Sequence, residues 1–131
     1  MANWHTCSAI SSLRSRVNAV APGRDRSSDG TIGDAAHATT KSDHNPDSLG
    51  RVKAIDITDD ELLFNGNAFA EILRHNKDPR IKYVIHDGRI FSSLIKPWQW
   101  RPYVGANAHA RHVHVSVTDE GADDGSPWRL K

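Results

Sequence analysis

The chain has 131 residues, of which 37% are hydrophobic and 25% are charged, and this length supports one compact domain with a modest core. The formal net charge of +1 disfavours a protein whose main task is to hold a polyphosphate backbone. A single cysteine, Cys7, excludes an intrachain disulfide and a cysteine-rich zinc site. The 8 histidines point to a metal or acid–base site, because imidazole binds metals and titrates near neutral pH.

The first part of the chain is predicted to contain one helix and one long irregular segment. Apolar residues at helical spacing predict an amphipathic helix over 8–19, with Ser8 as its N-cap. Pro22-Gly23 ends this helix. Residues 21–50 are rich in Gly, Asp, Ser and Thr and show no period. Long ordered loops of this kind in compact domains tend to be functional.

The middle of the chain is predicted to alternate strands with a helix. Residues 52–58 favour a strand, and residues 66–76 favour a second helix. Asp87-Gly88 is a strong hairpin signal between two further strands, over 81–86 and 89–95.

The last part of the chain completes the predicted fold. Trp98, Trp100 and Tyr103 lie in a loop, where packing is favoured over the alternative of a glycopeptide groove. Residues 112–117 alternate regularly and predict a strand, whereas 118–131 are acidic and turn-like and are expected to be partly loose. The element order predicts one α+β domain over residues 1–131, with a small antiparallel sheet, flanking helices and a long N-terminal loop.

The strand over 112–117 has two chemically different faces. Alternation places three valines on one face and the polar residues His112, His114 and Ser116 on the other. In the strand over 52–58, the isoleucines are expected to face the core, which places Asp56 on the opposite face. If the two strands share a sheet, the side chains of Asp56 and His114 can converge.

A third ligand candidate, His44, lies at the end of the long loop in Ser42-Asp43-His44-Asn45-Pro46. Two histidines and one carboxylate leave the fourth position of a tetrahedral zinc ion for water, which is the pattern of catalytic sites. Zinc lowers the pKa of water in such a position to about 7 and polarises a carbonyl group. The alternative is that His44, Asp56 and His114 are unrelated polar residues on solvated faces.

A family resemblance rests on the same residues. Ser42-x-His44, then Gly50, Ala54 and Asp56, and much later His112-x-His114, resemble the zinc peptidases of the D-alanyl-D-alanine carboxypeptidase, lysostaphin and Hedgehog group. The pattern is most similar to the D-Ala-D-Ala carboxypeptidase branch, which includes bacterial cell-wall peptidases and phage endolysin domains. The resemblance implies a Hedgehog-like or D-Ala-D-Ala-peptidase-like fold.

The resemblance also implies a role for each matching residue. His44, Asp56 and His114 would bind one Zn²⁺ per chain, and His112 would act as general base or stabilise the tetrahedral intermediate. The gap of 12 positions between His44 and Asp56 is longer than is usual in the family. The Glu-x-x-His or Asp-x-x-His motif of several relatives is absent, and His109, three positions before His112, could fill a comparable catalytic role.

Further residues are weaker candidates. Ser42 and Asp43 could fix the geometry of the ligands, and Arg111 could bind a substrate carboxylate, although a solvated surface is the default for such an arginine. His37 lies in the long loop and is worth testing for the same reason.

The function that these expectations support is a zinc metallopeptidase that hydrolyses an amide bond in peptidoglycan stem peptides or cross-links. We expect a monomer with a peptidoglycan peptide as its partner and with neither nucleic acid nor a membrane. The sequence shows no signal peptide and no apolar run of about 18 residues. The protein would therefore be made in the cytoplasm and act on the wall after release, through a holin pore if a phage encodes it.

Two alternatives remain. An HNH-like nuclease would use His44 as base and His75 as a metal ligand, with Asn65 or Asn67 nearby, but it leaves His112-x-His114 unexplained. A zinc-binding module without catalytic activity, as in Hedgehog signalling domains, would keep the same ligands.

Overall fold

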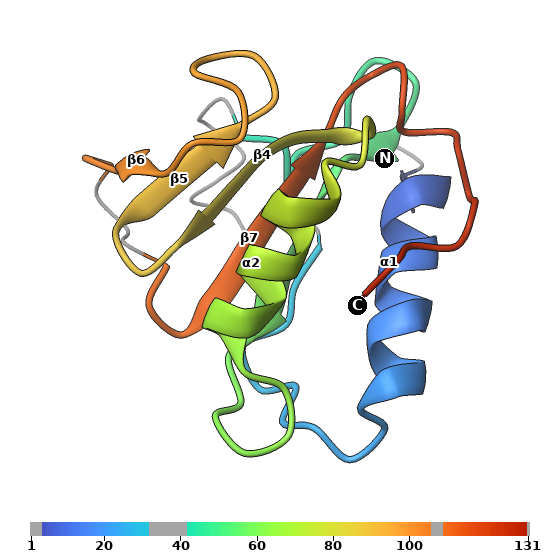
Figure 1. Cartoon of the computed structure of the whole chain (residues 1–131). Helices are drawn as coiled ribbons and strands as arrows, with labels where there is room; N and C mark the ends of the chain where they lie inside the picture. The colour runs from blue at the N-terminus through green and yellow to red at the C-terminus, as the bar shows by residue number, and fades with distance from the viewer. Residues whose placement is uncertain (1–3, 32–41, 106–108, 131) are drawn as a thin grey trace.

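The computed structural model describes residues 4–31, 42–105 and 109–130, and within them the chain has an α+β fold (Figure 1). A five-stranded antiparallel sheet has the order β3-β7-β4-β5-β6, and a short parallel pair, β1-β2, lies apart from it. The strands are β1 (His5–Thr6), β2 (Arg51–Val52), β3 (Ala54–Thr58), β4 (Ile81–His86), β5 (Arg89–Ser92), β6 (Arg101–Pro102) and β7 (His112–Val117). The helices are α1 (Ser8–Val20) and α2 (Gly66–Asn76).

Most predicted elements are confirmed, and the differences have local causes. α2, β4 and β7 have the predicted bounds, whereas the strand expected over 52–58 divides at Lys53 into β2 and β3. β5 ends at Ser92 because the Ser92 hydroxyl accepts hydrogen bonds from the backbone N–H groups of Leu94 and Ile95, which turns the chain. Cys7, and not Ser8, occupies the N-cap position of α1, without a side-chain cap.

The apolar core lies between the sheet and the two helices, which cover the same face of the sheet (Figure 1). The three valines of β7 point into this core together with Ile55 and Ile57 of β3. Helix α1 contributes Ile10, Leu13 and Val17, and α2 contributes Phe69, Ala70 and Leu73. The opposite face of the sheet carries the candidate site, so the helices support the site from behind.

The loop aromatic residues pack largely as predicted. The rings of Trp98 and Trp100 lie 5.9 and 4.9 Å from that of Phe91, between centroids, and both tryptophans pack against the core. Tyr103 differs, because its ring lies 5.9 Å from that of His109 at the candidate site.

The end of the chain is packed, which corrects the expectation of a loose segment over 118–131 for its described part. Trp128 is 2% exposed, and its indole N–H donates to the carbonyl of Ala9 in α1. The Arg80 guanidinium lies 4.0 Å from the centre of the Trp128 ring and donates to the carbonyls of Asp124 and Ser126. Trp128, to which the sequence pattern assigned no role, therefore anchors this segment.

Within the described residues, no helix is both long and apolar enough to span a membrane.

Candidate metal centre

Two of the predicted ligands face each other across neighbouring strands. β3 and β7 pair antiparallel with Asp56 directly opposite His114, a position that brings the Cβ atoms of two residues to within about 5 Å. The pairs on either side, Ile55 with Val115 and Ile57 with Val113, point to the core. The expectation that the two strands share a sheet is therefore confirmed, and strand alternation brings Asp56 and His114 together.

His44 reaches the same point from the loop that precedes β2. Its backbone N–H donates to the Ser42 hydroxyl, and the N–H of Lys53 donates to the carbonyl of Asp43, which ties the loop to the sheet. The His44 Nδ1 lies 2.6 Å from the carbonyl oxygen of Thr31. A carbonyl oxygen only accepts, so Nδ1 carries a proton and donates to it, and Nε2 is directed at the site.

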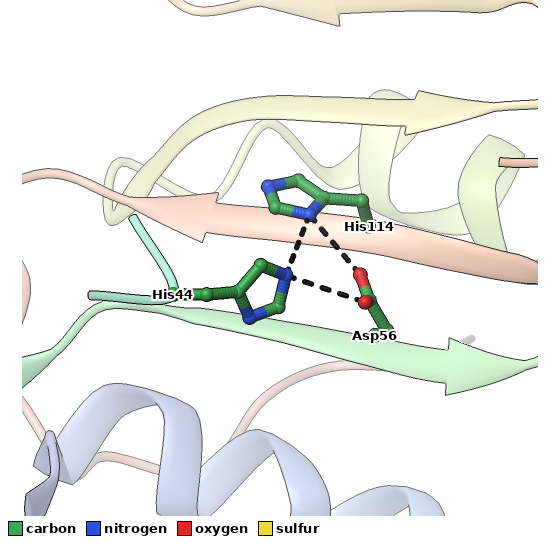
Figure 2. A group of neighbouring side chains, drawn as sticks. All are labelled: His44, Asp56 and His114. Atoms are coloured by element: carbon green, nitrogen blue, oxygen red, sulfur yellow. Dashed lines mark hydrogen bonds and ion pairs between the residues drawn. The ribbon is translucent and has the colours of Figure 1, made fainter. Parts of the chain in front are cut away.

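The side chains of His44, Asp56 and His114 form a compact triangle, in which each carboxylate oxygen of Asp56 faces a different histidine (Figure 2). The His44 Nε2 lies 3.2 Å from the His114 Nδ1 and 3.3 Å from the Asp56 Oδ2, and the His114 Nδ1 lies 3.1 Å from the Asp56 Oδ1. Ligands on neighbouring corners of a tetrahedral zinc ion, with bonds of about 2.0–2.1 Å, are separated by about 3.3 Å. These three side chains could thus hold one metal ion.

The charges at the triangle match this chemistry. Burial raises the pKa of Asp56, but hydrogen bonds and charge interactions with His114 and His44 outweigh burial and hold that pKa well below its ordinary range. Burial lowers the pKa of His44, but its contact with Asp56 outweighs burial and the pKa is raised. The carboxylate is therefore ionised and can bind a cation.

His114 is fixed on both sides. Its Nε2 lies 2.8 Å from the hydroxyl oxygen of Ser116, so an N–H at this position can donate while Nδ1 faces the triangle. The Tyr83 ring stacks on the imidazole, 5.4 Å away at an interplanar angle of 12°. Neither contact was predicted for these two residues, although β-strand alternation already placed Ser116 on the same face as His114.

Two further histidines adjoin the triangle. The His112 Nε2 lies 3.5 Å from the Asp56 Oδ2 and 2.9 Å from the His109 Nδ1. Burial and neighbouring imidazoles lower the pKa of His109 to about 4, and burial is the largest cause of the lowered pKa of His112. Both side chains are therefore neutral near pH 7, and one of them donates a hydrogen bond to the other.

A buried histidine for which the sequence suggested no role holds these two residues in place. His86 is 1% exposed, and its Nδ1 lies 3.0 and 3.1 Å from the carbonyl oxygens of His109 and His112. Its Nε2 lies 3.4 Å from the Asp59 carboxylate. His109 has a φ of 56°, and the hydrogen bond to its carbonyl stabilises this left-handed backbone. The available signal was a polar residue at a core-facing strand position, which needs a buried partner.

The weaker candidates lie around the triangle and not in it. The Ser42 hydroxyl positions the His44 backbone, and the Asp43 carboxylate pairs with Lys82 at 3.1 Å. Arg111 is exposed and lines a separate polar cavity with Asp59. His37 lies outside the described residues.

A polar cavity of about 390 Å³ opens beside the triangle. Its wall includes Tyr83, whose ring stacks on His114, and the cavity therefore adjoins a candidate ligand. Charged side chains of both signs line it, among them Asp43, Asp47, Lys53 and Lys82.

Comparisons of the chain with protein-family models, with curated proteins and with solved structures gave no match. The case for a metal centre therefore depends on the geometry and chemistry of the described side chains.

Proposed function

We propose that this protein is a zinc-dependent peptidase that hydrolyses an amide bond in peptidoglycan stem peptides or cross-links. The observation that carries the proposal is the convergence of two imidazole nitrogens, 3.2 Å apart, on the Asp56 carboxylate, whose two oxygens lie 3.3 and 3.1 Å from His44 and His114. The resemblance of Ser42-x-His44, Asp56 and His112-x-His114 to the D-Ala-D-Ala carboxypeptidase branch supplies the substrate class. The protein would act as a monomer on the cell wall, after release from the cytoplasm.

The metal ion, when bound, supplies a Lewis acid that polarises the scissile carbonyl and lowers the pKa of a water molecule. His44, Asp56 and His114 would hold the ion. The His112 Nε2 lies 3.5 Å from the Asp56 Oδ2, and its imidazole is neutral near pH 7 because burial lowers its pKa. It can therefore accept a proton from the attacking water and pass it to the leaving amine.

His109 supports His112 in this role. The separation of 2.9 Å between the His109 Nδ1 and the His112 Nε2 allows one imidazole to donate a hydrogen bond to the other. The low pKa of His109, about 4, keeps it a neutral partner when His112 takes up a proton. The same geometry allows the two residues to exchange the roles of base and oxyanion donor, so both belong to the proposed catalytic group.

The cavity beside the triangle suits a peptide with carboxylate groups. Lys82 is partly exposed on its wall, and Lys53 lies on the same wall. A bound carboxylate would compete with Asp43 for Lys82. Stem peptides of peptidoglycan carry free carboxylates next to their amide bonds, which matches this lining.

The test combines metal analysis with digestion of purified bacterial cell walls and mass spectrometry of the new termini. The wild-type protein should contain about one zinc per chain and release peptide amines from the wall. His112→Ala should keep the zinc and hydrolyse about 10²–10⁴-fold more slowly, as expected for loss of a general base. His75→Ala, at an exposed histidine on α2, is the matched control and should leave both zinc content and hydrolysis unchanged.

The same experiment separates the alternatives. Zinc binding without any new peptide termini would favour a zinc module without catalytic activity. Loss of DNA cleavage in His75→Ala would favour the HNH-like nuclease. Nothing in the geometry supports the nuclease, because Asn65 caps α2 through a hydrogen bond to the Ala68 N–H. His75 also belongs to neither candidate metal group among the described residues.

A further inference from the structure

A second group of ligand atoms shares Asp56 with the first. One nitrogen each of His109 and His112 and one carboxylate oxygen of Asp56 all lie within 4.8 Å of one another. The two nitrogens are 2.9 Å apart, and the His112 Nε2 is 3.5 Å from the Asp56 Oδ2. Both separations lie close to the spacing of about 3.3 Å expected between ligands of one tetrahedral zinc ion.

The orientation of Asp56 allows it to serve both groups. Its Oδ1 lies 3.1 Å from His114, whereas its Oδ2 lies 3.3 Å from His44 and 3.5 Å from His112. A carboxylate with its two oxygens directed in this way can bridge two cations about 3.5–4 Å apart, the separation found in two-metal sites.

We propose that Asp56, His109 and His112 form a second Zn²⁺ site, weaker than the first, and that its occupation inhibits hydrolysis. The inhibitory part rests on the proposed function. Two imidazoles and a carboxylate favour zinc over magnesium or calcium, which prefer oxygen ligands. The second site is weaker because its carboxylate is shared with a cation already bound nearby, whose charge repels another.

Inhibition follows from the chemistry of the shared residues. The proposed proton transfer uses the imidazole nitrogens of His112 and His109, and a metal ion bound to both side chains would occupy the same nitrogens. Zinc at high concentration therefore opposes the reaction that zinc at low concentration supports.

The binding test is a titration of metal-free protein with Zn²⁺, followed by calorimetry and by metal analysis after equilibrium dialysis. The wild-type protein should bind two zinc ions with separated affinities. His109→Asn should bind one, at the affinity of the tighter site. Asparagine is the suitable replacement because it tolerates the left-handed backbone of residue 109, φ 56°, so the fold and the first site are retained. His75→Ala should bind two ions, like the wild type.

The activity test follows hydrolysis of cell walls during addition of zinc beyond the first equivalent. The wild-type rate should fall and should recover when a chelator-buffered solution removes the weaker ion. His109→Asn should lose this inhibition, measured relative to its own rate with one zinc bound.

The possible failures are distinguishable. A wild-type protein that binds one zinc at all concentrations and hydrolyses cell walls overturns the second site and leaves the proposed function intact. A protein that binds two zinc ions but releases no wall peptides overturns the proposed function and the inhibition, while the second site stands. Two bound ions in His109→Asn would also overturn the ligand assignment of the second site.

Discussion

The two faces of β7 differ in what keeps their side chains buried. On the core face, Val113, Val115 and Val117 are buried against the helices and need no particular partner, because burial of apolar area is nondirectional. On the other face, His114 and Ser116 are also buried, yet the hydrogen-bonding atoms of this face are directed at named partners. Burial of polar groups costs free energy unless they are hydrogen-bonded. The polar face therefore depends on specific partners, whereas the apolar face depends on buried area alone.

This contrast separates stability from function along a single strand. Neighbouring residues such as His114 and Val115 share backbone geometry but point to opposite faces. Substitutions at the two positions should therefore affect different measurements. Polar-face changes should act on metal content and hydrolysis, and core-face changes should act on the free energy of unfolding.

The largest effect is expected for His114→Ala on the polar face. The change removes one of the three candidate ligand side chains, so zinc should be lost from the first site. The metal contributes several kcal/mol of transition-state stabilisation, and hydrolysis of cell walls should therefore fall by about 10³-fold or more. Metal analysis and rate measurement on the same sample check both effects. Retention of zinc and activity together would show that the ligand assignment is wrong.

Val115→Ala is the matched change on the core face. It removes buried methyl groups from a side chain that is 0% exposed and leaves a cavity, which should lower the free energy of unfolding by about 2 kcal/mol. Zinc content and the rate of hydrolysis at low temperature should stay at the wild-type level. Urea denaturation of the metal-free protein gives the stability without a contribution from zinc binding. A loss of zinc comparable with that of His114→Ala would contradict the separation of the two faces.

The sequence predicted the polar face where periodicity carries the information. Alternation placed His114 opposite the valines and Asp56 opposite the isoleucines, so that both lie on one face once the two strands pair, and the structure adds the register that sets them directly opposite each other. What alternation does not encode is the partner of a buried polar atom across the chain. Tyr83 on His114 and Trp128 against α1 depend on tertiary packing between distant segments. The end of β5 at Ser92 likewise depends on one side-chain hydrogen bond.

The position of His44 shows the same limit in the loop. A motif predicted that it joins Asp56 and His114, and its ring does so only because the carbonyl of Thr31, 13 positions earlier, fixes the orientation. No local pattern in an irregular segment specifies such a contact. The resemblance to a family supplied the residue, and the fold supplied its geometry.

His86→Ala sharpens the comparison, because His86 stabilises the polar face from inside the protein. Without its imidazole, the carbonyls of His109 and His112 lose a donor, and the two side chains proposed as catalytic should become less well oriented. Zinc at the first site should remain, and kcat should fall roughly 10-fold, the lower end of the effect of removing a supporting hydrogen bond. His86→Asn, which keeps an N–H donor, should recover part of kcat. Equal losses in both variants would indicate that His86 only fills space.

The smallest effect is expected for substitution of Asp29, whose hydrogen bonds hold the segment that contains Thr31 against the sheet. Its carboxylate accepts hydrogen bonds from Arg24 and from the backbone N–H and hydroxyl of Thr58. Burial raises the pKa of Asp29, but these bonds outweigh burial and the pKa is lowered. Because the folded-state pKa lies below the unfolded value of about 3.9, Asp29 stabilises the fold above that pH, and the contribution is lost as the pH falls through the folded-state pKa.

Asp29→Asn should therefore destabilise the protein by about 1 kcal/mol at pH 7, and this difference from the wild type should shrink as the pH falls below 4. Urea denaturation of the metal-free proteins at several pH values measures it. Arg24, which is 5% exposed, loses its ionised partner in this variant, and that loss is the source of the difference at neutral pH. A difference that is independent of pH would mean that the Asp29 charge contributes nothing. The segment that contains Thr31 would then be held by the shape of the residue 29 side chain alone.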